Sequence, residues 1–406
     1  MYWSRSVSAD RKAKMKKQEE RDRRQHAKWV DTYEKILPLV GAKDLFQRLP
    51  EATREGIRRL RFPSPEICFG DDFNQADERE NVREAVARAL HQFRFRTGDG
   101  HEIVAQDCFR VVFSLREAIN LLRVKPPDGS LSLLVAQTRK KLGAVCDELV
   151  DKQLISLFLD MDLALAKFTR IDTAIYWYEP KYERVGPGKG LFRITLHKSP
   201  PDRIGILHNG ERRRAFRCGA SFGPLGVKWV DVPASLFGIN ESGKYPLYVQ
   251  SHAIRNLHER VPIGDGGFVH DAMWQSLYSP KVTQNQKGEY LIEFRCFDYK
   301  LGYFVAEVVE QSILVTTFLF LTMQGTPEAS ALYERLRLRR PDIEQLGLDS
   351  LGNYLFTDLQ EDSELASIFD TCGCGHLLKM LRPETQPDWE SSYARDVRKY
   401  LGMKLT

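Results

Sequence analysis

Apolar residues recur every three or four positions between residues 29 and 170, with charged residues between them. This spacing gathers the apolar side chains on one face of a helix, so it predicts amphipathic helices. The pattern is clearest in 29–49, 81–95, 108–124 and 133–168, and a Pro-Pro-Asp-Gly-Ser segment separates the last two. We therefore expect residues 29–170 to form a helical bundle.

The period changes from about four residues to two near residue 171. Residues 173–180, 190–198 and 203–219 alternate, or are rich in β-branched and aromatic residues, which is typical of strands. Asn209 and Gly210 lie between two strand-like runs and tolerate positive φ angles, so they predict a hairpin turn. The glycine-rich stretch 185–190 has neither the spacing of a phosphate loop nor a following helix, and it predicts only a turn.

Three further strand-like runs follow two predicted helices, at 252–260 and 268–279. The runs are 288–297, 302–310 and 312–323, and their short connections predict an antiparallel meander. In the first run, alternation turns Tyr290, Ile292, Phe294 and Cys296 towards the core and Glu289, Glu293 and Arg295 away from it. Residues 313–321 are apolar on both faces, which predicts a central strand that is covered on both sides.

Residues 327–406 return to a helical pattern, and Thr326-Pro327-Glu328 is a typical helix start. The chain is therefore predicted to be an α+β protein. It has an N-terminal helical bundle, a β-rich middle with helices packed on an antiparallel sheet, and a helical C-terminal cap. The expected domains are 1–28 (basic arm), 29–170 (helical), 171–326 (β-rich) and 327–406 (cap).

The composition is that of a chain that folds, since 42% of its 406 residues are hydrophobic and 11% are aromatic. The net charge of +5 comes from residues 1–28, where ten Lys and Arg outnumber four Asp and Glu. Such a run can bind nucleic-acid phosphates through counterion release. Its acidic residues at 19, 20 and 22 equally suit a solvated helix with i,i+4 ion pairs, and both interpretations stay open.

We expect a soluble, cytoplasmic protein that makes no contact with a membrane. The longest apolar run, 313–323, has about half of the roughly 20 residues that a membrane-spanning helix needs. The start of the chain has no apolar stretch of the kind that a secretory signal requires. Seven scattered cysteines favour reduced thiols over a disulfide framework.

The segment Pro246–Val261 is the strongest candidate for chemistry. On a helix with about 100° per residue, one sector gathers His252, Arg255, Asn256 and Glu259. A surface helix needs only a polar outer face, so amphipathicity alone does not require a site. These residue types, however, suit metal-independent RNA cleavage, which needs a base, an acid and fixed positive charge on the phosphate oxygens. The opposite side of the helix is apolar: Ala253, Ile254, Leu257 and Val261.

The segment Ser-His-Ala-Ile-Arg-Asn-Leu-His-Glu-Arg-Val, followed by a second helix and three strands, resembles small toxin-like domains related to the BrnT and RelE families. Helices cover a twisted antiparallel sheet in these domains, and many members are endoribonucleases. The resemblance covers about residues 246–323. It implies functional roles for six residues: Ser251, His252, Arg255, Glu259, Arg260 and Arg295.

Each of these residues also has an ordinary structural interpretation. Ser251 and His252 can cap or start the helix, and Arg255 can pair with Glu259 four residues later. His258 lies off both faces and is expected to be solvated, while Glu293 and Arg295 suit a cross-strand interaction. These alternatives stay open.

Two other clusters carry candidate chemistry. The hairpin strand 211–219 is rich in arginine, which suits phosphate contacts and equally suits pairing with acidic surfaces. We expect no cofactor. Cys372, Cys374 and His376 could ligate zinc, but the usual spacing is absent, so a loop with buried thiols is expected and no metal residue is assigned. The candidate nucleic-acid-binding residues are Arg212, Arg213, Arg214 and Arg217.

The sequence thus suggests a protein that binds RNA or a ribonucleoprotein and cleaves RNA without a metal. His252 or Glu259 would transfer protons, and Arg255, Arg260 and Arg295 would stabilise the phosphate. The resemblance implies a bacterial toxin or phage-defence setting, in which a protein inhibitor is a second expected partner. The alternative is a non-catalytic interaction protein that uses the toxin-like fold to bind a protein or a nucleic acid.

Overall fold

The computed structural model describes residues 3–59, 64–124, 129–149, 153–186, 189–208, 210–240, 242–263, 266–355, 358–380 and 393–402. The chain divides into two compact units, and each consists of two segments of sequence. Unit 1 contains Met1–Ala164 and Tyr178–His197, and unit 2 contains Leu165–Trp177 and Lys198–Thr406. The division therefore falls inside two strands, β4 (Ile175–Gly186) and β5 (Lys189–Ser199).

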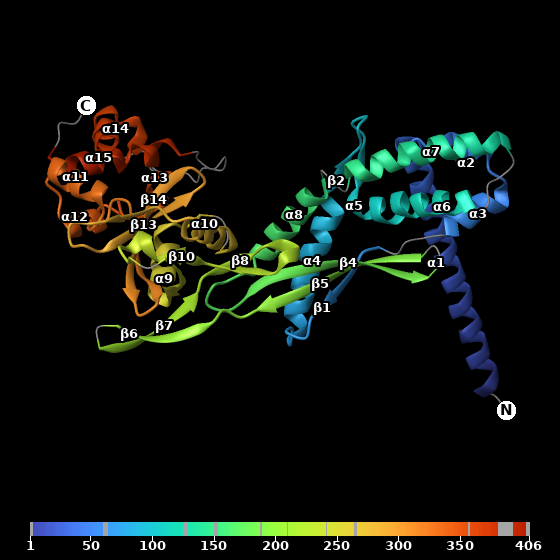
Figure 1. The fold of residues 1–406 in the computed structure, drawn as a ribbon, viewed down its shortest axis with the longest axis horizontal. Helices are drawn as coiled ribbons and strands as arrows, with labels where there is room; N and C mark the ends of the chain where they lie inside the picture. Colours follow the sequence, from blue (N-terminus) through green and yellow to red (C-terminus); the bar gives the residue numbers. More distant parts are fainter. Residues whose placement is uncertain are drawn as a thin grey trace. The chain divides into compact units, whose positions relative to one another are not determined.

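Unit 1 is mainly helical, as the apolar spacing predicts (Figure 1). Its first helix reaches into the core at its C-terminal half, where Trp29 and Tyr33 are buried and their ring centroids lie 5.7 Å apart. Tyr33 also packs on Phe46, at 5.4 Å. The helices are α1 (Trp3–Leu39), α2 (Lys43–Arg48), α3 (Glu51–Arg59), α4 (Ala76–Gln92), α5 (Ala105–Asp107), the π-helical turn η1 (Cys108–Val112), α6 (Phe113–Val124), α7 (Gly129–Glu148) and α8 (Leu154–Ala166).

Three short strands in unit 1 were not predicted. β1 (Glu66–Phe69) pairs in parallel with β5, where Glu66 lies opposite Arg193, and β2 (Arg94–Arg96) pairs with β3 (Glu102–Val104). Strands of three or four residues are too short to show a clear two-residue period. Their extended conformation is therefore determined by pairing with a neighbouring strand and cannot be read from their own sequence. An ion pair between Arg193 and Glu66, at 3.2 Å, ties β5 to β1.

Residues 14–24 of the basic arm lie exposed on α1. Two i,i+4 contacts lie along it, from Arg24 to Glu20 at 2.7 Å and from Gln18 to Asp22 at 2.9 Å. These contacts are the ones that a solvated helix would make. Whether the arm also binds phosphates stays a prediction.

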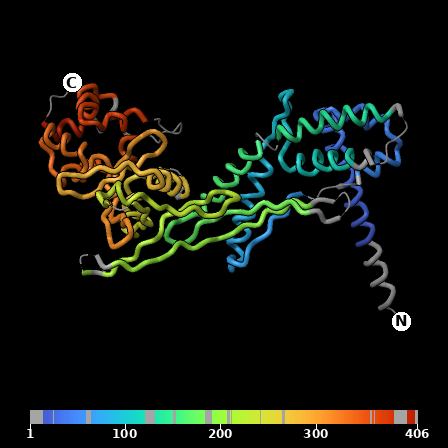
Figure 2. Tube along the Cα trace, in the orientation of Figure 1, coloured from blue at the N-terminus to red at the C-terminus, as the bar shows by residue number. Residues whose placement is uncertain are grey.

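Unit 2 is built on an eight-stranded mixed sheet, in the part of the chain that the structure describes. The order is β12-β13-β14-β15-β11-β7-β6, and β10 pairs with β11 off this path. The β6–β7 hairpin can be followed in Figure 2 and turns at Gly210, whose φ is 82°. The strands are β6 (Arg203–His208), β7 (Glu211–Arg217), β10 (Asp231–Pro233), β11 (Lys244–Gln250), β12 (Val282–Gln284), β13 (Tyr290–Cys296), β14 (Tyr299–Val309) and β15 (Ser312–Phe320).

The predicted meander of β13, β14 and β15 is confirmed, because both neighbouring pairs are antiparallel. β15 lies in the middle of the sheet, as its apolar sequence predicts. The sheet is nevertheless mixed rather than purely antiparallel, because β11 pairs in parallel with β15, with Val249 opposite Val315. The connection between them contains helices as well as the strands β12, β13 and β14, which gives the length that a parallel pair needs.

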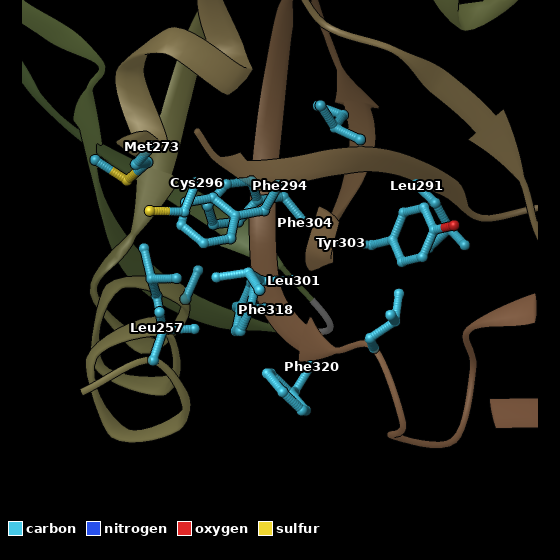
Figure 3. Packing of buried hydrophobic residues seen from close by; sticks show 14 of the residues in the cluster. Leu257, Met273, Leu291, Phe294, Cys296, Leu301, Tyr303, Phe304, Phe318 and Phe320 are labelled. Carbon is cyan, nitrogen blue, oxygen red and sulfur yellow. The ribbon is translucent and has the colours of Figure 1, made fainter. Parts of the chain in front are cut away.

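Aromatic side chains fill the core of unit 2. The rings of Phe294, Phe304 and Phe318 lie 5.5 Å from one another on three neighbouring strands (Figure 3). Leu257 and Met273 join this core from two helices, α9 (Ser251–Arg260) and α10 (Gly266–Tyr278). The burial of these side chains fixes the orientation of α9 on the sheet. It therefore also determines which residues of α9 face outward.

Short helices form the predicted C-terminal cap, which packs on the same hydrophobic core. The predicted helix start at Thr326 is confirmed, since its Oγ1 accepts a hydrogen bond from Ala329 N at 3.1 Å. No helix within the described residues is both long enough and apolar enough to cross a bilayer. The cap helices are α11 (Pro327–Leu336), α12 (Arg340–Gln345), α13 (Leu351–Leu355), α14 (Ser363–Thr371) and α15 (Tyr393–Tyr400).

Candidate functional site

Helix α9 follows β11 without a loop and carries the predicted polar face. Ala253 and Leu257 are buried, whereas His252, Arg255 and Glu259 are exposed. The predicted helix and its two faces are therefore confirmed. The apolar face holds α9 on the sheet and leaves the polar face available for contacts outside the core.

His252 lies at the centre of a small polar network. The guanidinium Nη2 of Arg255 lies 3.3 Å from its Nδ1, and Nδ2 of Asn256 lies 3.1 Å from its Nε2. Asn256 also donates to the Oγ1 of Thr317 on β15, at 2.9 Å. Both the guanidinium and the amide nitrogen can only donate, and a neutral imidazole has one accepting nitrogen, so Arg255 donates to His252 in the tautomer in which Nδ1 accepts.

A hollow of about 500 Å³ opens at the N-terminal end of α9. We term it the basic hollow, because none of the described residues that line it is Asp or Glu. Two of its arginines come from β7, which reaches the start of α9 because Ala215 lies opposite Gln250 in the sheet. The lining residues are Arg213, Arg214, Gln250, Ser251, His252 and Arg255.

The start of α9 adds to the positive potential of the basic hollow. The first N–H groups of a helix have no partner within the helix and carry the positive end of its dipole. Gln250 is the N-cap residue, and its side chain makes no capping hydrogen bond. The start of α9 and the three arginines thus line the same hollow, and both favour an anion there.

Gln250 itself is an unusual residue for a helix start. Only 2% of its surface is exposed, and neither Oε1 nor Nε2 has a hydrogen-bond partner within the described part of the chain. A buried amide without partners costs free energy of about 1–3 kcal/mol. Its position in the lining of the basic hollow places this unused hydrogen-bonding capacity where a ligand would bind.

A second hollow, of about 630 Å³, lies on another side of α9, and we term it the larger hollow. Ser251 and Arg255 line both hollows. On one wall Arg170 and Asp172 form a two-pronged ion pair, with distances of 3.1 and 3.0 Å. His258 on α9 also lines the larger hollow. Partial burial lowers the pKa of its imidazole; the positive charge of Arg170 lowers it further, whereas the negative charge of Asp172 raises it.

His270 on α10 is the most buried polar residue of the larger hollow, with 6% of its surface exposed. Its Nε2 lies 2.9 Å from the carbonyl oxygen of Gly219, so Nε2 carries the ring proton and donates. Nδ1 is then a lone-pair acceptor, and it has no partner among the described residues. Burial lowers the pKa of His270 to about 4, although the Gly219 hydrogen bond opposes this shift, so the ring is neutral at pH 7.

A third hollow, of about 400 Å³, lies between α9 and the C-terminal cap. His252 and Asn256 line it from α9, and Arg340 and Glu344 line it from α12. His252 therefore borders two hollows. The cap helices do not fill the space beside the polar face of α9.

The other residues singled out in the sequence lie elsewhere. Arg260 forms an ion pair with Asp349, whose side chain is only 6% exposed. Burial raises the pKa of the Asp349 carboxyl, and the positive charge of Arg260 opposes this rise. This pair fastens the end of α9 to the segment after α12. Glu259 lines the larger hollow, as Arg255 does.

Arg295 does not join the residues around α9. Its Nε lies 2.9 Å from Oε2 of Glu293, and it donates to the carbonyl oxygen of Asp298 at 3.2 Å. It lines none of the three hollows around α9. This ion pair lies within one strand, whereas a cross-strand interaction was expected. Across the strands, Glu293 interacts with Lys300 on β14, whose Nζ lies 3.9 Å from Oε1 of Glu293.

The arginine cluster of β7 divides into two groups. Arg213 and Arg214 line the basic hollow, whereas Arg217 pairs with Asp231 at 3.0 Å and with Asp202 at 3.4 Å. The guanidinium of Arg212 lies over Gly205 on the neighbouring strand. Two of the four predicted arginines are thus placed for an anion at α9.

The Cys-x-Cys-x-His segment is not assembled as a metal site. His376 Nε2 lies 2.6 Å from the carbonyl oxygen of Lys300, and Cys372 and Cys374 are buried. Burial raises the pKa of both thiols. Within the described residues, no group of three or more His, Cys, Asp and Glu side chains could hold a metal ion.

Sequence reasoning did not find Gln250, Asp172, Thr317 or His270. Gln250 ends a strand and His270 lies in an apolar helix, and neither position has a pattern that marks it as functional. Only the fold brings them to α9. No family model, no curated protein and no solved structure matches this chain.

Proposed function

We propose that this protein binds single-stranded RNA through the basic hollow and that His252 cleaves the bound strand. The observation that carries the proposal is that Arg213, Arg214 and Arg255 line one hollow together with the uncapped start of α9. A phosphodiester is the anion that suits this arrangement, because the forked guanidinium groups can contact its two non-bridging oxygens in pairs. Gln250, whose buried amide has no partner among the described residues, also lines this hollow.

The same arrangement supports cleavage beside the bound phosphate. When the phosphate takes over Arg255, the 3.3 Å interaction of Arg255 with Nδ1 of His252 ends, and this nitrogen becomes free to accept a proton. The 2′-hydroxyl gives its proton to Nδ1 and attacks the adjacent phosphorus. The bond from phosphorus to the 5′-oxygen then breaks, and the departing oxygen takes a proton from water. The products are a 2′,3′-cyclic phosphate and a 5′-hydroxyl.

The arginines have a defined electrostatic role in this step. Negative charge increases on the non-bridging oxygens as the fifth bond to phosphorus forms. Arg213 and Arg214 line the basic hollow on the strand beside α9, so they can neutralise this charge without moving with the helix. Arg260 and Arg295 take no part in this proposal, because neither lines the basic hollow.

The biological setting follows from the resemblance of residues 246–323 to toxin-like domains. A toxin or phage-defence nuclease would act on cellular or phage RNA and would need an inhibitor until it is required. We retain this setting as part of the proposal, with a protein inhibitor as a second partner.

The test uses the full-length protein and an end-labelled single-stranded RNA of 20 nucleotides. Wild type is expected to yield fragments that end in a 2′,3′-cyclic phosphate. The His252→Asn variant should lose activity by about 100-fold or more, because positioned proton transfer contributes 10²- to 10⁴-fold. It should still bind a 2′-O-methylated strand, which cannot be cleaved.

The matched control is His91→Asn, which changes an exposed histidine at the end of α4 that lines none of the three hollows around α9. This variant should keep its activity within about twofold of wild type. Binding without cleavage by wild type would refute the catalytic step and favour a non-catalytic interaction protein. Absence of binding even at low salt would refute the whole proposal.

A further inference from the structure

The larger hollow lies directly beside the basic hollow, because Ser251 and Arg255 line both. A strand whose phosphate occupies the basic hollow therefore brings the rest of that nucleotide next to the larger one. At about 630 Å³, the larger hollow has the size of an ordinary small-molecule site.

The lining of the larger hollow combines apolar and polar groups. Five apolar side chains contribute to it, and four of them, Ile171, Leu257, Val269 and Met273, are buried. The fifth is Ile254 on the half-exposed side of α9. Such a lining suits a planar group with apolar faces and polar edges, which describes a nucleobase.

His270 supplies a hydrogen bond that is still unused. Its Nδ1 is a buried lone-pair acceptor without a partner among the described residues, and its tautomer is fixed by Gly219. We propose that the larger hollow receives the nucleobase adjacent to the bound phosphate, with Nδ1 of His270 accepting a hydrogen bond from an N–H group of that base. This inference rests on the proposed RNA-binding function.

The ion pair of Arg170 and Asp172 extends the polar contacts. Each carboxylate oxygen has lone pairs beyond the one that Arg170 uses, and the guanidinium has further N–H groups. The pair therefore presents a donor and an acceptor side by side, which is the arrangement that base edges recognise. The low pKa of His270 keeps its accepting nitrogen unprotonated at neutral pH.

The experiment compares strands that differ only in their bases. Four 2′-O-methylated strands of 12 nucleotides, containing only A, only C, only U or no bases, are measured by fluorescence anisotropy. Wild type should bind at least one base-containing strand about tenfold more tightly than the abasic strand. Methyl groups that replace the N–H hydrogens of the preferred base should abolish this advantage.

Ile254→Trp fills the larger hollow from a half-exposed position. It should reduce the preference for bases to less than about twofold and leave the affinity for the abasic strand unchanged. The matched control is Ile368→Trp, at another partly buried isoleucine that lines none of the hollows around α9, and it should keep the full preference.

Two results would overturn the inference. One of them would leave the proposed RNA-binding function intact, and the other would refute it as well. Equal affinity of wild type for the abasic strand and the three base-containing strands would show that no base is bound, while the phosphate site would stand. If no strand binds at low salt, the proposed function fails as well. An occupant of another class, such as a protein side chain, would give this second result.

Discussion

The buried, neutral His270 predicts a specific dependence of stability on pH. Its pKa is about 4 in the folded protein, against 6.5 for an ordinary histidine, and burial is the main cause. Between these two values the unfolded chain binds a proton that the folded protein does not bind. The free energy of unfolding therefore falls as the pH is lowered through this interval and does not change through His270 above it.

The magnitude follows from the same two values. At pH 4.5 an unfolded histidine with a pKa of 6.5 is almost fully protonated, while the folded one is only about one quarter protonated. The linkage relation then gives a loss of about 2.5 kcal/mol between pH 7.5 and pH 4.5 from this residue alone. This amount is a large part of the stability of an ordinary domain.

The assay is urea unfolding of wild type and His270→Gln at pH 4.5, 5.5, 6.5 and 7.5. Glutamine can still donate to the carbonyl oxygen of Gly219 but does not titrate. The free-energy difference between the two proteins should therefore change by about 2.5 kcal/mol across the series, with wild type losing more at low pH. The control is His258→Gln, whose more exposed side chain should give a clearly smaller change. Parallel pH curves for wild type and His270→Gln would refute the assignment of a buried neutral imidazole.

Three further substitutions test the packing around α9 and in unit 1. Arg260→Ala should lower the free energy of unfolding by about 2 kcal/mol, because it leaves the buried Asp349 without its partner, and it should leave RNA affinity unchanged in an anisotropy titration. Gly267→Ala should cost about 1–3 kcal/mol in urea unfolding, because a Cβ there would lie 1.9 Å from the carbonyl oxygen of Ala166. A Cβ at Gly143 on α7 would meet open space, so Gly143→Ala should instead stabilise the protein by about 0.5–1 kcal/mol. A loss of stability in this variant would contradict the helical conformation of Gly143.

The sequence was informative wherever a local pattern decided the structure. The apolar spacing of α9, the Thr326 helix start and the apolar β15 strand could each be read from a few neighbouring residues. The pairing of β1 with β5 could not, because Glu66 and Arg193 are far apart in the chain and four residues carry no clear period. The same reason hides the parallel contact between β11 and β15.

The candidate site shows this limit most clearly. His252 and Arg255 were found because they share one helix face, and Arg213 and Arg214 were found as a charged run. Their convergence depends on the antiparallel pairing of β7 with β11, which no local pattern records. The polar groups of Gln250 and His270 became notable only through their burial without partners, which is a property of the folded chain.

The most direct test of the central claim is the salt dependence of RNA binding by wild type and by Arg213→Gln/Arg214→Gln/Arg255→Gln. Each phosphate of a single strand that is no longer neutralised lowers the slope of log affinity against log salt by about 0.7, and the three arginines share one phosphate. The control is Arg335→Gln/Arg337→Gln/Arg395→Gln, which removes the same charge from exposed positions of the C-terminal cap. The account predicts a lower affinity and a slope reduced by about 0.7 for the first variant alone. Equal slopes and affinities for all three proteins would contradict it.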